Sequence, residues 1–207
     1  MTRILLSLGA LLMLGMSPAA AQSDTKPDHV FTESPSDHAT GAADAPHTLI
    51  VYASNMCPHC QQWFTKEWPI VKRDLVDTGQ LRVVFRPLPS APVQLSMIGF
   101  MMAECAPEND YFAVMENQFR RQDTILAKAK SGGLREEFDA VARVAGLDSK
   151  DSIDTCLGDE AHLAAIHQSA ARAGAAGVSG IPSFFLDGER FTGDHKAADF
   201  AAAIDAD

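Results

Sequence analysis

The chain has 207 residues, of which 46% are hydrophobic, and its formal net charge is −10 at pH 7. This acidic balance argues against a role in binding nucleic acid or an anionic membrane surface. The hydrophobic content and the length suit one globular domain with a sizeable core.

Residues 1–21 have the pattern of a secretory signal peptide. Arg3 precedes an apolar run over 4–16, which is too short to span a bilayer comfortably, and small residues up to Ala21 follow it. We therefore expect an exported protein that is cleaved after Ala21; an uncleaved membrane anchor is the alternative. Export would place all four cysteines in an oxidising compartment, where disulfides persist.

Residues 22–45 are rich in Ser, Asp, Thr, Pro and Ala and show no apolar periodicity, which predicts a disordered leader. Histidines scattered in and just after this stretch could form a metal site, but histidines in a mobile tail are more often simply solvated. They are His29, His38 and His47. We therefore expect no metal site there.

Regular structure is expected from Pro46 onward. The apolar run over 47–53 predicts a buried strand, and the residues after Cys57 predict a helix. Pro69 should bend or divide this helix, because it cannot donate an internal hydrogen bond. Gly79 is a plausible end for it.

A second strand is expected over 81–86, ended by Pro87. Residues 46–91 therefore predict a β-α-β unit. Its first strand ends just before Cys57-Pro58-His59-Cys60. In open α/β sheets, ligand-binding and catalytic groups gather at the carboxyl ends of the strands. A Cys-x-x-Cys pair at that place either binds a metal with a second pair or cycles between dithiol and disulfide.

Residues 92–176 change character and favour helices throughout. The expected helices cover residues 93–106, 110–121, 134–145, 149–157 and 159–173. The chain then returns to strand over 183–186, and Asp187-Gly188 is typical of a tight hairpin turn. A paired strand over 189–192 and a closing helix over 196–204 complete a β-β-α unit within 177–207.

This order, with the Cys57–Cys60 motif at the start of the first helix and Ile181-Pro182 before the hairpin, resembles the thioredoxin fold with a helical insertion. More closely, it is similar to the DsbA-like periplasmic thiol:disulfide oxidoreductases. Further strings that carry the resemblance are Tyr52-Ala53-Ser54, Phe85-Arg86 with Pro89, residues 102–106, residues 155–157 and residues 182–188. The expected fold class is α/β, a thioredoxin-like fold with an inserted all-helical subdomain.

The motif predicts disulfide exchange. A thiolate on Cys57 would be stabilised by the unpaired N–H groups at the helix N-terminus and by a protonated His59. Pro58 fixes the first turn, and Cys60, one turn further on, should be buried and act as the resolving thiol. Stabilising the reduced form makes the Cys57–Cys60 disulfide a better oxidant, so donation of disulfides is the favoured direction.

The resemblance implies a cis peptide bond before Pro182, in a turn that lies against the motif. The Ile181 backbone could pair with an extended substrate, and an exposed apolar surface is expected near Met56 and Ile181. Two positions depart from the family pattern. Val51 stands where many thioredoxin-like proteins have a buried acid, and Ile181 stands where Thr or Val is usual.

Cys105 and Cys156 both lie in the helical block, 51 residues apart. In an oxidising compartment they are expected to form a structural disulfide, which would stabilise the fold by about 4 kcal/mol on a chain-entropy model. Two buried free thiols are the alternative. A zinc site that uses all four cysteines lacks a second closely spaced pair.

The favoured function is donation of disulfides to unfolded or folding exported proteins with free thiols, in the periplasm. A membrane redox partner would reoxidise the protein, and no cofactor is expected. A disulfide reductase or isomerase of the same fold is one alternative. A copper-binding periplasmic protein is the other, because Cys-x-x-Cys binds soft metals well.

Overall fold

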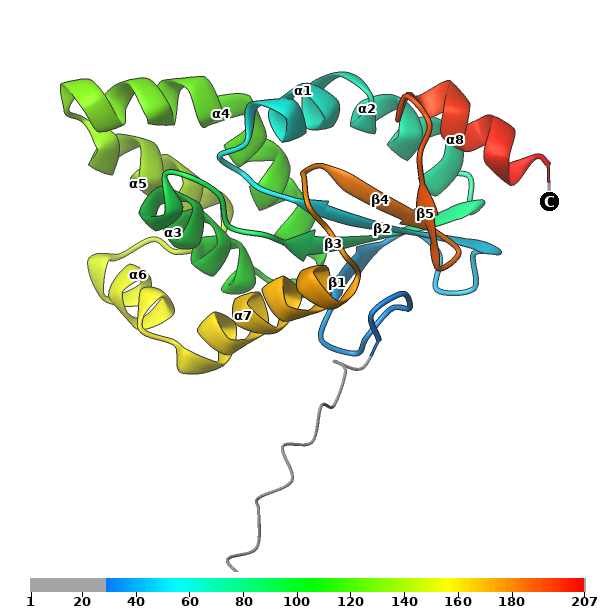
Figure 1. Ribbon diagram of the computed structural model, residues 1–207. Helices are drawn as coiled ribbons and strands as arrows, with labels where there is room; N and C mark the ends of the chain where they lie inside the picture. The colour runs from blue at the N-terminus through cyan, green and yellow to red at the C-terminus, as the bar shows by residue number, and fades with distance from the viewer. Residues whose placement is uncertain (1–28, 207) are drawn as a thin grey trace, which may run out of the picture.

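The computed structural model describes residues 29–206 (Figure 1). Its five-stranded sheet has the order β1-β3-β2-β4-β5. Strands β2 and β3 are parallel, and the other neighbouring pairs are antiparallel. The strands are β1 (His38–Thr40), β2 (His47–Ala53), β3 (Leu81–Pro87), β4 (Ser183–Leu186) and β5 (Glu189–Phe191). The predicted signal peptide lies outside the described residues.

Helices α1, α2 and α8 lie above the sheet in Figure 1, α7 lies below it, and α3 to α6 form a block to one side. Their bounds are α1 (Pro58–Lys66), α2 (Trp68–Val71), α3 (Val93–Glu104), α4 (Tyr111–Ser131), α5 (Leu134–Val144), α6 (Lys150–Leu157), α7 (Glu160–Ala175) and α8 (Ala197–Ile204). A π-helical turn, Lys72–Val76, and a 3₁₀ turn, Glu108–Asp110, complete the set. The predicted fold class, α/β with a helical insertion, is confirmed.

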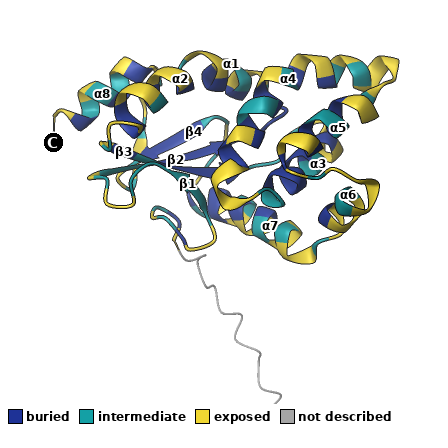
Figure 2. Ribbon diagram, turned by 180° about the vertical axis from the view of Figure 1, so that it is seen from behind, coloured by how far each residue is buried: buried dark blue, intermediate teal, exposed yellow. Residues whose placement is uncertain are grey.

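Strand β2 is buried on both faces, which explains its nearly continuous apolar sequence. Leu49 and Val51 pack into the larger core under α1 and α8, whereas Ile50 and Tyr52 pack into a smaller core on the α7 side. Figure 2 shows the sheet and the inward sides of the surrounding helices as buried. A central strand held on both faces gives the motif that follows it a rigid base.

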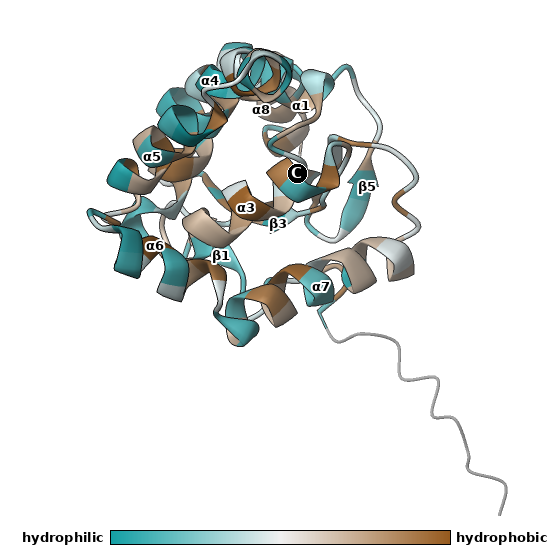
Figure 3. Cartoon of the chain, turned by 90° about the vertical axis from the view of Figure 1, so that its left-hand side faces the viewer, coloured by the Kyte–Doolittle hydropathy of each residue, from teal (hydrophilic) through white to brown (hydrophobic). Residues whose placement is uncertain are grey.

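The first helix divides where the sequence predicts. Glu67 separates α1 from α2, and Pro69 lies in the first turn of α2, where its missing N–H costs nothing. Phe64 of α1 stacks on Phe119 of α4 at 4.1 Å between ring centroids. This contact ties the motif helix to the helical block. In Figure 3, α3 is largely hydrophobic, in keeping with its place among the other helices.

The prediction of a disordered leader over 22–45 is wrong for residues 29–45. Within this segment, β1 pairs with β3, and Val30 is buried in the core on the α7 side. The segment is held by polar contacts rather than by an apolar face. The Asp37 carboxylate accepts a 2.7 Å hydrogen bond from the fully buried Arg86 guanidinium of β3. An apolar periodicity therefore could not reveal it.

All three histidines expected to be merely solvated also have polar partners, and that of His29 is the Thr32 hydroxyl at 3.2 Å. His38 lies 2.9 Å from the Glu104 carboxylate and stacks on Tyr111, and His47 lies 2.8 Å from the Asp187 carboxylate. Among residues 29–206, no group of three or more His, Cys, Asp or Glu side chains could hold a metal ion. Within the same range, no helix is long and apolar enough to cross a membrane.

Candidate redox-active site

The motif begins where the central strand ends. After β2 the chain turns through Ser54 to Met56, and Cys57 caps the N-terminus of α1 with extended backbone angles, φ −88° and ψ 123°. Pro58 occupies the first turn of the helix, and both Pro58 and His59 are exposed. Cys57 is half-buried, Cys60 is fully buried, and both are free thiols.

The pKa of Cys57 is lowered to about 6. The largest cause is the Cys60 thiol, which donates a hydrogen bond to the Cys57 sulfur. The backbone N–H groups of Cys60 and His59 and the charge of His59 also lower the pKa, while burial opposes them. Cys57 is therefore largely a thiolate at neutral pH. The sequence predicted that the helix N-terminus and His59 would stabilise the Cys57 thiolate. It did not predict that the hydrogen bond from the Cys60 thiol lowers the pKa of Cys57 most.

The pKa of Cys60 is shifted in the opposite direction, upward. Burial raises its pKa far above the ordinary range, and its interaction with Cys57 raises it further. The backbone N–H of Ser54 donates to the Cys60 sulfur at 3.4 Å. The two thiols therefore differ in role. Cys57, the more accessible of the two, is the nucleophile, and Cys60 keeps its proton until Cys57 no longer carries the charge.

The loop before β4 closes against Cys57. The Ile181–Pro182 peptide bond is cis, and the Ile181 carbonyl oxygen lies 3.7 Å from the Cys57 sulfur. Pro182 and His59 line one cavity of ≈ 280 Å³ beside the motif. The other residues that line this cavity are Gln62, Trp63, Lys66, Glu67, Asp194, His195 and Lys196. The structure therefore brings together Cys57, Cys60, His59, Ile181 and Pro182.

Met56 does not belong to this surface. Its side chain is only 1% exposed and packs in the main core, so the expectation that Met56 forms part of an exposed apolar surface is wrong. The turn from Ser54 to Met56 folds inward, because its backbone and side chains are tied to the helical block. The Asn55 side-chain amide, for example, donates to the Ser96 carbonyl oxygen of α3 at 3.2 Å.

A buried polar network lies behind the motif, and the sequence did not predict it. The Asn55 amide donates to the Gln118 side chain at 2.7 Å and accepts from the Ser96 hydroxyl at 2.7 Å. The Gln122 amide donates to the carbonyl oxygens of Asn55, at 2.8 Å, and Cys57, at 3.1 Å. These contacts fix the backbone that carries Cys57 to α3 and α4.

Gly99 of α3 makes this network possible. A Cβ atom there would lie 2.1 Å from the Gln118 side-chain oxygen and 2.2 Å from the Asn55 side-chain nitrogen. The Gln118 amide also donates to the Gly99 carbonyl oxygen at 2.8 Å. One feature of the sequence could have indicated this network. Gln118 and Gln122 are four residues apart, so they lie on one face of a helix, and the other residues of that face are apolar.

Val51 lies in the main core and is fully buried, behind the motif. The polar side chains that surround the turn after β2 are Ser54, Asn55, Ser90, Ser96, Gln118 and Gln122. All of them are neutral. The turn after β2 is therefore held by hydrogen bonds among uncharged side chains.

Cys105 and Cys156 lie apart from the motif, in the helical block. They form a disulfide with 5.9 Å between their Cα atoms. Cys105 is the residue that ends α3, and Cys156 lies in α6. The bridge therefore ties α3, which also carries Ser96 and Gly99 of the network, to the outermost part of the block.

Titration of the Cys57 thiolate tests the assignment of causes. Replacing Cys60 by Ala should raise the pKa of Cys57 more than replacing His59 by Ala does, because the Cys60 hydrogen bond is the larger effect. The ultraviolet absorbance of the thiolate and the pH dependence of alkylation both report this pKa. Thr65→Ala, an exposed change in the same helix but outside the cavity, is the control. An equal or larger effect of His59→Ala would contradict the ranking.

Comparison with known proteins agrees with this geometry. The family model described as thioredoxin matches residues 33–206. Among curated proteins, the chain is 31% identical to a Na(+)/H(+) antiporter NhaA 3 of Salinispora tropica over 81% of this chain and 24% of that one. It is 24% identical to a putative protein-disulfide oxidoreductase of Rickettsia conorii, over 76% of this chain and 55% of that one. The chain thus spans about a quarter and about half of these relatives.

The fold is similar to the crystal structure of alpha-DsbA1 of Wolbachia pipientis. The TM-score is 0.73, with 24% sequence identity, over 84% of this chain and 92% of that one. The predicted resemblance to DsbA-like proteins is therefore confirmed at the level of the fold.

Proposed function

Because the chain belongs to the thioredoxin family, we propose that it is a thiol:disulfide oxidoreductase that donates the Cys57–Cys60 disulfide to exported proteins with free thiols. The observation that carries the proposal is the contrast between the two cysteines. The pKa of Cys57 is lowered to about 6, whereas burial raises that of Cys60. A thiolate so stabilised favours the reduced protein, which makes its disulfide a good oxidant.

Exchange proceeds in two displacements. A substrate thiolate attacks the Cys57 sulfur of the disulfide, the Cys57–Cys60 bond breaks, and Cys60 leaves and takes up a proton, aided by the Ser54 N–H. A second substrate thiolate then attacks the substrate sulfur of the mixed disulfide, and Cys57 leaves as its stabilised thiolate. The substrate loses two electrons and two protons. The motif gains the two electrons and, at Cys60, one of the protons, and the other proton goes to solvent.

The Ile181–Pro182 loop is proposed to hold the substrate. The Ile181 carbonyl faces Cys57, so an extended chain beside this loop would bring its cysteine to the Cys57 sulfur. Residues 46–91 and 177–207 would act as the two thioredoxin-like parts, and residues 92–176 as an inserted helical part. Action in the periplasm, cleavage of residues 1–21 and reoxidation by a membrane partner belong to the same proposal.

Two measurements test whether the protein donates disulfides to its substrates or reduces them. The oxidised protein should oxidise a reduced, unfolded substrate stoichiometrically, and the motif should stay largely reduced when it equilibrates with a glutathione buffer. A motif that remains oxidised in mildly reducing glutathione would instead favour a disulfide reductase. Stoichiometric retention of Cu(I) with no substrate oxidation would favour the copper carrier.

A further inference from the structure

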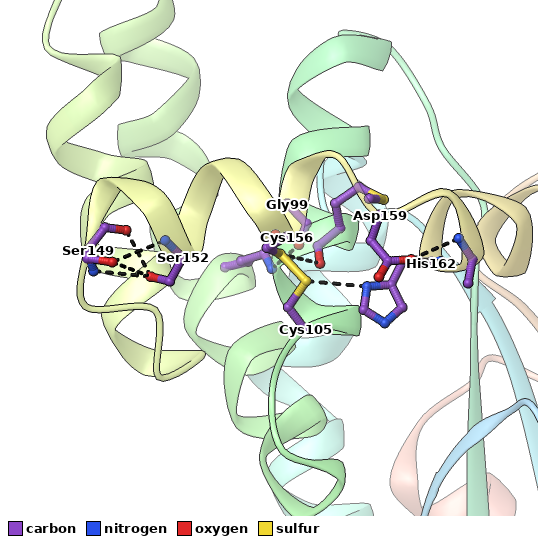
Figure 4. The surroundings of a disulfide bond; sticks show 10 residues. Gly99, Cys105, Ser149, Ser152, Cys156, Asp159 and His162 are labelled. Carbon is purple, nitrogen blue, oxygen red and sulfur yellow. Dashed lines mark hydrogen bonds between the residues drawn. A yellow bond between two sulfur atoms is a disulfide. The ribbon is translucent and has the colours of Figure 1, made fainter.

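The disulfide between Cys105 and Cys156 has a histidine against one of its sulfurs (Figure 4). The Nδ1 atom of His162, in the first turn of α7, lies 3.3 Å from the Cys105 sulfur. The Cys156 sulfur lies instead 3.3 Å from the Met101 carbonyl oxygen. The two halves of the bridge therefore differ: one contacts an ionisable ring, and the other a backbone acceptor.

The two sulfurs also differ in access. Cys156 is 5% exposed, whereas Cys105 and His162 are half-buried. An open cavity of ≈ 420 Å³ lies over the bridge, and its walls include both cysteines, His162, Asp151 and Asp159. The cavity is shallow and open to solvent rather than enclosed. A thiol of modest size can therefore approach the bridge from solvent, and it meets Cys105 first.

We propose that the Cys105–Cys156 bridge is a second thiol-exchange site, open to small neutral or cationic thiols through this cavity and entered at the Cys105 sulfur. The site takes no part in the chemistry of the Cys57 motif. Reduction would release the end of α3 from α6, and α3 carries two of the groups, Ser96 and Gly99, that hold the turn before Cys57.

The exchange needs two equivalents of the small thiol. The first, as thiolate, attacks the Cys105 sulfur; a bond to Cys105 forms, the bond to Cys156 breaks, and Cys156 leaves and is protonated, its thiol then donating to the Met101 carbonyl. The second thiolate attacks the small-thiol sulfur of the mixed disulfide. Cys105 then leaves as a thiolate that His162 stabilises by hydrogen bonding, and the two small thiols depart as a disulfide.

Charge sets the preference among thiols. Among the described residues that line the cavity, Asp151 and Asp159 are acidic, and His162 is the only basic side chain. Because these carboxylates are near solvent, their repulsion of an anionic thiol is modest. We expect a cationic thiol to react up to about fivefold faster than an anionic thiol at equal thiolate concentration and low salt.

The test begins with the Cys57→Ser/Cys60→Ser double variant, in which the bridge holds the two remaining cysteines of the chain. Cysteamine, mercaptoethanol and glutathione serve as cationic, neutral and anionic thiols. Alkylation and peptide mass spectrometry then follow the reduction, with circular dichroism recorded in parallel. We expect reduction while the fold persists, a transient adduct on Cys105, and cysteamine faster than glutathione. Because the motif is absent, the result does not depend on the proposed function.

Three further variants sharpen the test. Asp151→Asn should narrow the preference for cysteamine, whereas Asp154→Asn should not, because Asp154 lies on the same helix but outside this cavity and pairs with Lys150. His162→Phe should prolong the Cys105 adduct, because Cys105 becomes a poorer leaving group. Reduction only in step with unfolding, an adduct on Cys156, or equal rates for all three thiols would each overturn the proposal.

Discussion

Replacing Cys57 by Ser is expected to abolish disulfide donation. The Cys57 sulfur is the half-exposed member of the pair, it carries the lowered pKa, and it faces the Ile181 carbonyl. A serine hydroxyl at this position cannot form the disulfide. Oxidation of a reduced substrate should therefore fall to the uncatalysed rate. The fold should persist, because Cys57 is not part of the buried core.

Cys60→Ser is the matched control for this loss. It also abolishes donation, but the Cys57 thiolate can still attack a disulfide of an oxidised substrate, releasing one substrate thiolate and leaving a mixed disulfide that nothing within the motif can resolve. Substrate adducts should therefore accumulate on Cys57 and be absent from Cys57→Ser, as seen by non-reducing electrophoresis and peptide mapping. Adducts that form through Cys60 in Cys57→Ser would reverse the assigned roles of the two cysteines.

Asp37→Ala is expected to destabilise the protein by about 3–5 kcal/mol. The Asp37 carboxylate is 4% exposed and pairs with Arg86, whose side chain is fully buried. It also pairs with Arg172 at 3.2 Å. Removing the carboxylate leaves the buried Arg86 guanidinium with neutral acceptors only, namely carbonyl oxygens of the N-terminal segment and the Tyr52 hydroxyl. The cost is large because the charge stays buried.

Urea unfolding measures this loss as a lower midpoint. Glu33→Ala is the control, because Glu33 forms a similar pair with Arg82 of the same strand, but both side chains are partly exposed, at 30% and 21%. A pair of that kind contributes about 0–1 kcal/mol. Equal losses in the two variants would mean that the burial of Arg86 does not set the cost.

The sequence allowed strands β2 to β5, the block of helices and the division of the first helix to be predicted, because each depends on local chemistry. The apolar run of β2, the proline in α2 and the Asp187-Gly188 turn act within a few residues. Cys57 and Cys60 could be assigned for the same reason. Their placement at a helix N-terminus follows from where the strand before them ends.

The features that the sequence did not predict depend on contacts between residues far apart in the chain. Arg86 reads as an outward-facing strand residue until Asp37 and the carbonyls of the N-terminal segment are seen around it. Met56 reads as an exposed residue beside the motif until the turn is seen to fold inward. The network of Asn55 and Gln118 has polar side chains in the core, which a pattern of apolar residues cannot predict.

The two edge strands of the sheet affect how readily other polypeptide chains can pair with it. Strand β1 at one edge and β5 at the other are each only three residues long. β5 also carries the exposed charged residues Glu189 and Arg190. Short, charged edges offer little template for a further strand, and this is a known defence against aggregation. Under the proposed function, these edges would thus not capture unfolded substrates by backbone pairing.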